Sequence, residues 1–278
     1  MNAQKLTVLL ASLAVMAGAY AAPGGTFHER PKMQGKVGFS YGYKDVGVTV
    51  GALKEDSSGF HGGKKGEAGL GLTAISNGKL IGAKALYNLL KDTPVYGVDK
   101  NGVATFGSVN KTPAPDDHNG RSGGVLRMAK VAGHELYFGE WSYSGQANDS
   151  GHNVYYVGQE RATNLPTQGK VAYNVKGING YSKDGEMLSG TLTADFGAQK
   201  LTGTLKNRNL NIAINANEMN TAAAGFVGEA VASGKQAGGK VTGDVRGQFF
   251  GNGGSAVGGL ATFKTRRDLD TAFGGTKQ

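Results

Sequence analysis

Histidine is the side chain in this sequence best suited to binding a metal or moving a proton. All five histidines precede residue 165. His134 heads the aromatic run "HELYFGEW", and a strand over this run would place Leu136 and Phe138 on the side of His134. Tyr137 and Trp141 would lie on the other side. A histidine on the apolar side of a strand is a hydrogen-bonded core residue, a catalytic base or a metal ligand.

Known catalytic motifs are missing from the sequence. "HELYF" begins like the zinc-protease pattern H-E-x-x-H, but Phe138 stands in place of the second histidine, and that motif needs a helix. The chain has no cysteine to act as a nucleophile, no G-x-S-x-G turn, and no histidine pair at metal-ligand spacing. We therefore expect a protein that is not an enzyme.

The second half of the chain reads as antiparallel strands throughout. Residues in segment 239–250 alternate between small and large on the predicted inward side, from Val241 and Gly243 to Phe249. Such a pattern suits a small closed barrel filled by its own side chains, although a sandwich has similar strand spacing. The predicted strands are the eight segments 169–177, 187–196, 200–205, 210–217, 224–233, 239–250, 255–263 and 268–275.

The first half is more mixed. Segment 36–53 alternates like a strand or a hairpin, and the spacing of Ile81, Ala85 and Leu89 predicts a short amphipathic helix within 78–91. Segment 125–141 predicts a hairpin that turns at positions 132–133. The sequence thus predicts a mostly β protein with a small N-terminal β-rich ligand domain containing a short helix, followed by an eight-stranded antiparallel barrel. We expect domains at 22–165 and 166–278.

Residues 1–21 have the pattern of a secretory signal peptide. A positive Lys5 precedes an uncharged apolar stretch, and Ala19 and Ala21 form an A-x-A cleavage signal, so the mature chain is expected to begin at Ala22. Glycine is abundant, at 48 of 278 residues, which is typical of many strands joined by tight turns. The formal net charge is +9, but no Lys/Arg block is dense enough to indicate nucleic-acid binding.

Scattered histidines, many aromatic residues and a basic balance together suit a ligand that is apolar, anionic and metal-bearing. The chain has 11 tyrosines and 11 phenylalanines. Haem matches this description, because its iron accepts imidazole, its faces are apolar and its propionates are negative. The alternative is that each histidine is satisfied by a hydrogen bond or by solvent.

The C-terminal segments "FFGNGGSAVGGLATF" and "TAFGGTKQ" resemble the end of the barrel in transferrin-binding-protein-B-like proteins. Lipoprotein members of that group carry a cysteine for acylation, and this chain has none. In length, cleavable signal and two-part organisation the chain is similar to the hemophilins, which are released haem-carrying hemophores of the same group. The matching residues are Phe250, Gly251, Gly258, Gly259, Phe263, Ala272, Phe273, Gly274, Lys277 and Gln278.

This resemblance implies a secreted, monomeric hemophore of a Gram-negative bacterium, exported through the periplasm and the outer membrane. A Slam-type translocon would export it, and a TonB-dependent receptor would take the haem back for iron uptake. Host haemoglobin is a further candidate partner. The alternative function is a secreted or surface host-association factor that binds a host protein through the same barrel scaffold. A structural surface protein without a small ligand is the third possibility.

If the ligand is haem, His134 and His61 are our candidates for the axial iron ligands. His61 lies in the glycine loop "GFHGGKKG", where Lys64 follows it and could pair with a propionate.

Three other residues complete the predicted haem site. His118 lies in the loop "DDHNGR", and Arg121 of the same loop could pair with a propionate. Tyr41 is a candidate phenolate ligand or stacking partner.

Overall fold

The computed structural model describes residues 25–26, 38–42, 47–58, 62–72, 79–92, 97–107, 124–149, 151–182 and 185–278. Four of our expectations fall outside the described residues: the signal peptide over 1–21, His61, His118 and Arg121.

Eight antiparallel strands of the second half form a closed barrel, as predicted, in which the last strand pairs with the first. Each strand otherwise pairs with its neighbours in sequence. All eight predicted segments coincide with strands. The strands are β10 (Lys170–Ile178), β11 (Leu188–Asp195), β12 (Lys200–Lys206), β13 (Asn211–Asn220), β14 (Gly225–Ser233), β15 (Val241–Phe250), β16 (Ala256–Thr262) and β17 (Thr271–Lys277), with a short 3-10 turn, η2 (Arg267–Leu269), before the last.

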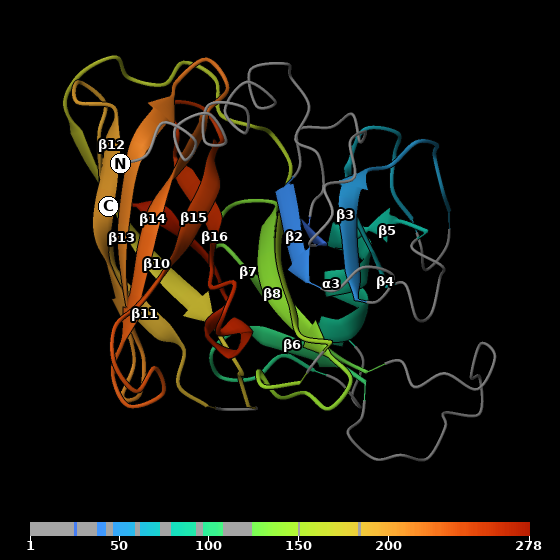
Figure 1. Cartoon of the computed structure of the whole chain (residues 1–278). Helices are drawn as coiled ribbons and strands as arrows, with labels where there is room; N and C mark the ends of the chain where they lie inside the picture. The colour runs from blue at the N-terminus through green and yellow to red at the C-terminus, as the bar shows by residue number, and fades with distance from the viewer. Residues whose placement is uncertain are drawn as a thin grey trace.

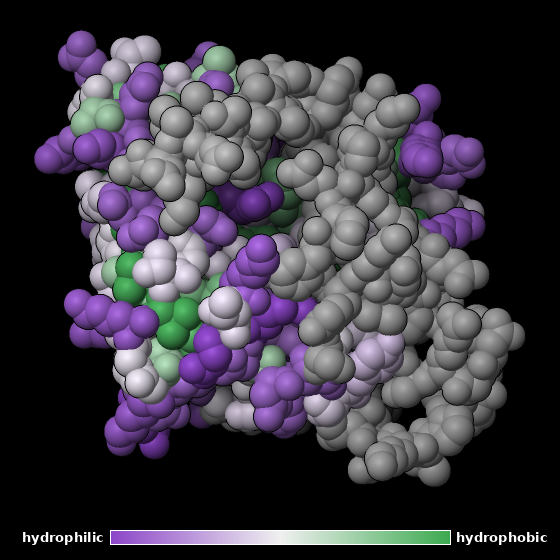
Figure 2. Space-filling view, in the orientation of Figure 1, coloured by the Kyte–Doolittle hydropathy of each residue, from purple (hydrophilic) through white to green (hydrophobic). Residues whose placement is uncertain are grey.

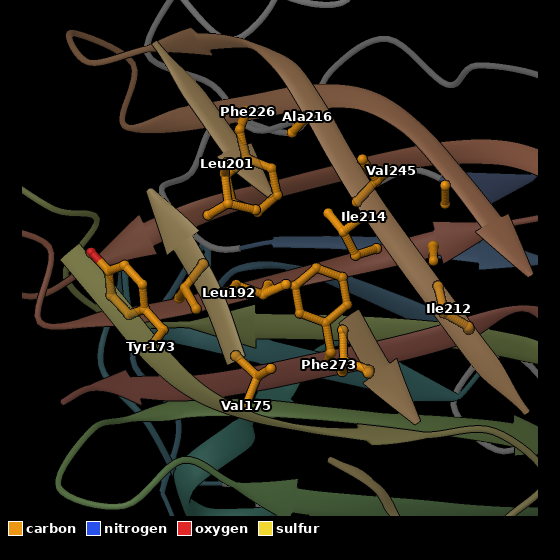
Figure 3. Close-up of a cluster of buried hydrophobic side chains, with 14 of the residues drawn as sticks. Tyr173, Val175, Leu192, Leu201, Ile212, Ile214, Ala216, Phe226, Val245 and Phe273 are labelled. Carbon is orange, nitrogen blue, oxygen red and sulfur yellow. The ribbon is translucent and has the colours of Figure 1, made fainter. Parts of the chain in front are cut away.

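The barrel interior is an apolar core made by the inward side chains of every strand. Figure 3 shows ten of these side chains pointing toward one another, among them Leu192, Ile214 and Phe273. Val245 and Phe249 are buried in the same cluster, as the predicted inward face of segment 239–250 requires. The period-two alternation of side chains in the sequence therefore predicted correctly both the strands and the residues that face the barrel interior.

The N-terminal part is built on a six-stranded sheet with the order β1-β2-β9-β8-β7-β6. Its β7 and β8 form the predicted hairpin, with the turn at positions 132–133. The strands are β1 (Gly25–Thr26), β2 (Gly38–Gly42), β6 (Val103–Phe106), β7 (Val125–Lys130), β8 (Leu136–Ser142) and β9 (Asn153–Gly158).

A three-stranded sheet and one helix cover this larger sheet. The small sheet contains β3 (Val48–Ala52), β4 (Ala68–Leu72) and β5 (Ile81–Gly82), and α3 (Ala83–Asp92) is the predicted helix. The reading of segment 36–53 as a hairpin was wrong, because β2 pairs with β9 whereas β3 pairs with β4. Competing strand partners far along the chain overrode the local pattern.

The six-stranded sheet is the middle layer of the molecule. In Figure 1 it lies between the barrel and the layer made by β3, β4, β5 and α3. Tyr137 and Trp141 point into the core shared with the small sheet and the helix. Leu136 and Phe138 point into a second core shared with the outside of the barrel. Every residue of β8 and β9 is buried, so both faces of these strands are occupied by protein.

Glycines on the outer wall of the barrel make room for the sheet. A Cβ atom on Gly274 would lie 2.7 Å from Cδ1 of Phe138, and one on Gly258 would lie 3.1 Å from Cδ1 of Leu136. Neither glycine has a positive φ, so close approach is the reason that a side chain is not tolerated there. The barrel wall under β8 is therefore shaped to fit the phenylalanine and leucine side chains of the sheet.

The coloured surface in Figure 2 is largely hydrophilic, with only small apolar areas. Among the described residues, one large hydrophobic residue is exposed: Tyr143, at 41%. No helix in the described part of the chain is long and apolar enough to cross a membrane.

Replacing Gly274 tests this fit between the domains. Gly274→Leu should lower the free energy of unfolding by about 1–3 kcal/mol, because the new side chain overlaps Phe138. Limited proteolysis should also cleave between the sheet and the barrel sooner. Ala213→Leu is the control, because Ala213 is exposed on an outward position of β13. Equal stability of the two variants would show that the close packing at Gly274 contributes nothing.

Candidate functional site

Glu140 is the centre of a buried polar network between the sheet and the barrel. Arg127 Nη1 donates to its Oε1 at 3.0 Å, and His152 Nε2 lies 3.0 Å from its Oε2. The backbone N–H groups of Gly180 and Tyr181, in the loop between β10 and β11, donate to the two oxygens at 2.7 Å each. Glu140 is only 2% exposed, so this carboxylate depends on donors from both parts of the molecule.

The pKa shifts in the network follow from this geometry. Burial alone would raise the pKa of Glu140, but the hydrogen bond with His152 and the nearby positive charges outweigh it and lower the pKa. Burial alone would lower the pKa of His152, but the hydrogen bond and the charge of Glu140 raise it. The pair is therefore held as a carboxylate and an imidazolium.

Arg267 and Asp270 extend the network onto the barrel. Arg267 Nη2 donates to the backbone oxygen of His152, and His152 Nδ1 lies 3.3 Å from the backbone oxygen of Arg267. Asp270 accepts from the backbone N–H of Phe263 at 2.6 Å and lies 3.4 Å from Arg267 Nε. Burial raises the pKa of Asp270 to about 7, against the opposing effects of that hydrogen bond and the neighbouring cations.

His152 is a buried member of the same network. Its side chain is 1% exposed and immediately precedes β9. Both ring nitrogens face partners, Glu140 and the backbone oxygen of Arg267. No ring nitrogen is left for a metal, so His152 is structural in this arrangement.

His134 lies in the turn between β7 and β8, two residues before β8 begins, and not within a strand as predicted. Its ring is next to Gly251 of the barrel: a Cβ atom there would be 3.2 Å from the imidazole Cε1. The side chain is half-buried, and its ring nitrogens make no hydrogen bond among the described residues. Leu136 and Phe138, which follow His134, pack against the outside of the barrel.

Tyr41 lies on β2, at the opposite end of the sheet from His134. The guanidinium of Arg267 is 5.5 Å from the centre of its ring. Burial, with a contribution from the charge of Asp270, raises the pKa of Tyr41 to about 12. The hydroxyl is thus neutral near pH 7 and is not prepared as a phenolate.

Lys64 lies in the connection between β3 and β4, where Ser57 and Gly63 pair across a hairpin. Its backbone N–H donates to Glu67 Oε2 at 3.0 Å, and its side chain is exposed. The small sheet lies on the side of the six-stranded sheet that faces away from the barrel (Figure 1). Lys64 and His134 therefore belong to opposite faces of the middle layer.

The described candidates do not converge on one point. His134, Tyr41 and Lys64 lie on three different edges of the N-terminal part, and no group of three potential metal ligands occurs within the ranges that the structure describes. The predicted site residues His61, His118 and Arg121 are outside those ranges.

Sequence reasoning missed the Glu140 network. Its only signal is an acidic residue between Gly139 and Trp141 in an otherwise apolar strand. Its donors Gly180 and Tyr181 are 40 and 41 residues away, where no spacing rule applies.

The chain is a mostly β protein in which a six-stranded sheet is seated on the outside of a closed eight-stranded antiparallel barrel. Residues 22–153 match the family model described as the HphA N-terminal heme-binding domain. Residues 163–277 match the HphA C-terminal domain. The chain carries both domains in order and belongs to the HphA family, and haem is the ligand of its N-terminal domain. The family is described by binding and not by a reaction.

Solved structures share the architecture. HpuA from Kingella denitrificans, as a complex with human haemoglobin and as the apo haemoglobin receptor, is 18% identical with a TM-score of 0.52. In both cases the alignment covers 90% of this chain and 89% of the other. Transferrin binding protein B from Actinobacillus pleuropneumoniae is 16% identical with a TM-score of 0.42, over 54% of this chain and 80% of that one.

The described residues fit haem at one position. His134 offers an imidazole without a hydrogen-bond partner, next to the glycine turn 251–254, in which little side-chain bulk would obstruct a flat ligand. His152 does not fit, because both of its ring nitrogens are engaged.

The buried pair predicts a large effect of His152 on stability and none on haem. His152→Ala should lower the free energy of unfolding by about 3 kcal/mol, because it leaves Glu140 buried without one of its donors. The absorption spectrum of bound haem should stay that of the wild type. Glu186→Ala is the control, since its ion pair with Arg208 is exposed and long, at 3.9 Å. A loss of stability no larger than that of Glu186→Ala would mean that the buried pair is not stabilising.

Stability should also depend on pH in a defined direction. Asp270 and His152 both have raised pKa values in the folded protein, so their contribution is present at low pH and lost as the pH rises. For Asp270 this loss occurs between its usual pKa near 4 and the raised value of about 7. The lowered pKa of Glu140 acts in the opposite direction, and its contribution is lost only below about pH 4.5.

Urea unfolding at pH 5.5, 7 and 8.5 measures this dependence. The free energy of unfolding should fall across the series, and Asp270→Asn should flatten the fall. Asp244→Asn, an exposed carboxyl on β15, should leave the slope unchanged. A rising free energy from pH 5.5 to 8.5 would refute the assignment.

Proposed function

We propose that this protein is a secreted hemophore that binds haem through histidine and delivers it to an outer-membrane receptor for iron uptake. The observation that carries the proposal is the match of residues 22–153 to the HphA heme-binding domain. Capture and release of haem need no catalysis, which agrees with a sequence that has no catalytic motif.

Imidazole is the expected iron ligand, since haem proteins commonly hold the iron through a histidine nitrogen. We propose His134 and His61 as the axial ligands, with His118 as the next candidate. The unpartnered imidazole of His134 supports its candidacy. Arg121 is proposed as a contact of the propionates. Lys64 and Tyr41 lie on other edges of the N-terminal part than His134, so they are left out of the proposed site.

The layer structure limits where the haem can bind. Both faces of β8 and β9 are covered, one by the helix and the small sheet and the other by the barrel. A flat ligand of haem's size would have to displace one of these cores to reach the centre of the sheet. We therefore propose that the haem lies at an end or an edge of the N-terminal domain, among the connections between strands.

Host haemoglobin is a second proposed partner. The support is the shared fold with HpuA, whose structure was solved with human haemoglobin. In this reading the protein takes its haem from haemoglobin. Export by a Slam-type translocon and return of haem through a TonB-dependent receptor are part of the same proposal, with an extracellular or cell-surface location. The alternative function is a secreted or surface host-association factor that binds a host protein through the same barrel scaffold.

Single histidine substitutions test the proposed ligands. The purified wild type should bind haem with a Soret band that persists through gel filtration. If both proposed ligands bind, the iron should be six-coordinate and low-spin. His134→Ala and His61→Ala should then each change the spin state or weaken haem retention, because each removes one axial nitrogen. Visible spectra recorded at equal haem occupancy provide the measurement.

His118→Ala identifies the ligand if the first assignment fails. A wild-type spectrum and wild-type retention in His134→Ala would make His134 a structural turn residue and direct the search to His118. A wild type that gains no Soret band upon haem addition would contradict the hemophore function itself.

A further inference from the structure

Tyr181, a residue of the barrel domain, inserts into the N-terminal domain. It belongs to the loop between β10 and β11 and is only 3% exposed. Its hydroxyl donates to Asp99 Oδ2 and accepts a hydrogen bond of 2.6 Å from Asn101 Nδ2. The same amide of Asn101 donates to the backbone oxygen of Gly185 at 2.8 Å. This loop of the barrel domain is thus hydrogen-bonded to one turn of the N-terminal domain.

That turn, 99–102, leads directly into β6. Asp99 organises it, since Oδ1 accepts from the backbone N–H groups of Asn101 at 2.9 Å and Val103 at 3.0 Å. Tyr87 of α3 donates to the backbone oxygen of Gly102 at 3.0 Å. One oxygen of the Asp99 carboxylate therefore accepts hydrogen bonds within its own turn, and the other accepts one from Tyr181 of the barrel domain.

The backbone of the same loop reaches a second part of the domain through Glu140. The N–H groups of Gly180 and Tyr181 supply half of the four donors to this carboxylate. Glu140 in turn binds Arg127 of β7, whose Nη1 also donates to the backbone oxygen of Gly145 at 2.9 Å. One barrel loop is thereby connected to the turn before β6, to β7 and to the segment after β8.

We propose that Tyr181 is a positioning residue for haem retention: the barrel holds β6, β7 and their flanking turns in the arrangement that retains the ligand. This inference rests on the proposed haem-binding function and extends it, because Tyr181 lies outside the matched heme-binding segment 22–153.

Tyr181→Phe in the full chain is the decisive variant, because it removes one hydroxyl and keeps the ring. Haem dissociation to an excess of apomyoglobin should become about five- to tenfold faster, because the two hydrogen bonds of the hydroxyl, to Asp99 and from Asn101, are lost. The spectrum of the bound haem should be unchanged, since no iron ligand is removed. Ser233→Ala is the control: it removes one hydroxyl, whose hydrogen bond from Asn211 Nδ2 at 3.1 Å lies entirely within the barrel domain, and its dissociation rate should equal that of the wild type.

Hydrogen exchange gives a readout that does not involve haem. In the haem-free protein, Tyr181→Phe should raise amide exchange at residues 99–103, and Ser233→Ala should not. Asn101→Ala combined with Tyr181→Phe should be non-additive, because both changes break the same contact. Faster haem loss with faster exchange and an unchanged spectrum supports the inference.

Three outcomes would overturn it. One is a Tyr181→Phe protein that releases haem at the wild-type rate. Another is a changed haem spectrum, which would mean that Tyr181 acts near the iron. The third is equally fast haem loss in Ser233→Ala, which would make the effect one of general stability. A wild type that binds no haem fails the proposed function instead, and the exchange experiment then decides separately whether Tyr181 holds the turn.

Discussion

An ionised carboxylate buried away from water must be surrounded by donors, and Glu140 imposes this requirement on the whole molecule. Two of its donors come from the N-terminal domain and two from the barrel. Separating the domains would leave a buried charge with half of its hydrogen bonds, an arrangement that is costly in a dry interface. The buried Glu140 carboxylate therefore keeps all four donors only when the two domains hold their present relative position.

The apolar contacts around this network have the opposite character. They cover a large area without fixing direction, because hydrophobic burial is not directional. Glycines on the barrel wall let Phe138 and Leu136 approach closely, and two arginines of the barrel lie over Phe39 and Tyr41 of β2. The hydrophobic contacts hold the sheet on the barrel, and the directional bonds of Glu140 and Tyr181 select one orientation for it.

The sequence was most informative where a local pattern decides the structure. The barrel strands were predictable because inward and outward positions alternate, as in segment 239–250, and α3 because its apolar residues recur at helical spacing. The separate partners of β2 and β3 were not predictable, since β2 pairs with β9, which lies far along the chain. His134 was assigned to the correct side of the hairpin, but the sequence could not reveal that the barrel occupies that side. Glu140 and Tyr181 gain their roles only from contacts between distant segments.

Closure of the barrel also sets an order for folding. The first barrel strand pairs with the last, with Asn174 opposite Thr276, so this pairing must overcome the entropy of a loop of about 100 residues. The wall that receives β8 is made by β10, β16 and β17, and it therefore spans the seam where the barrel closes. Until β10 and β17 pair, the barrel surface that packs against β8 is incomplete. The domain that is synthesised first thus completes its burial last, after the final strand of the chain is in place.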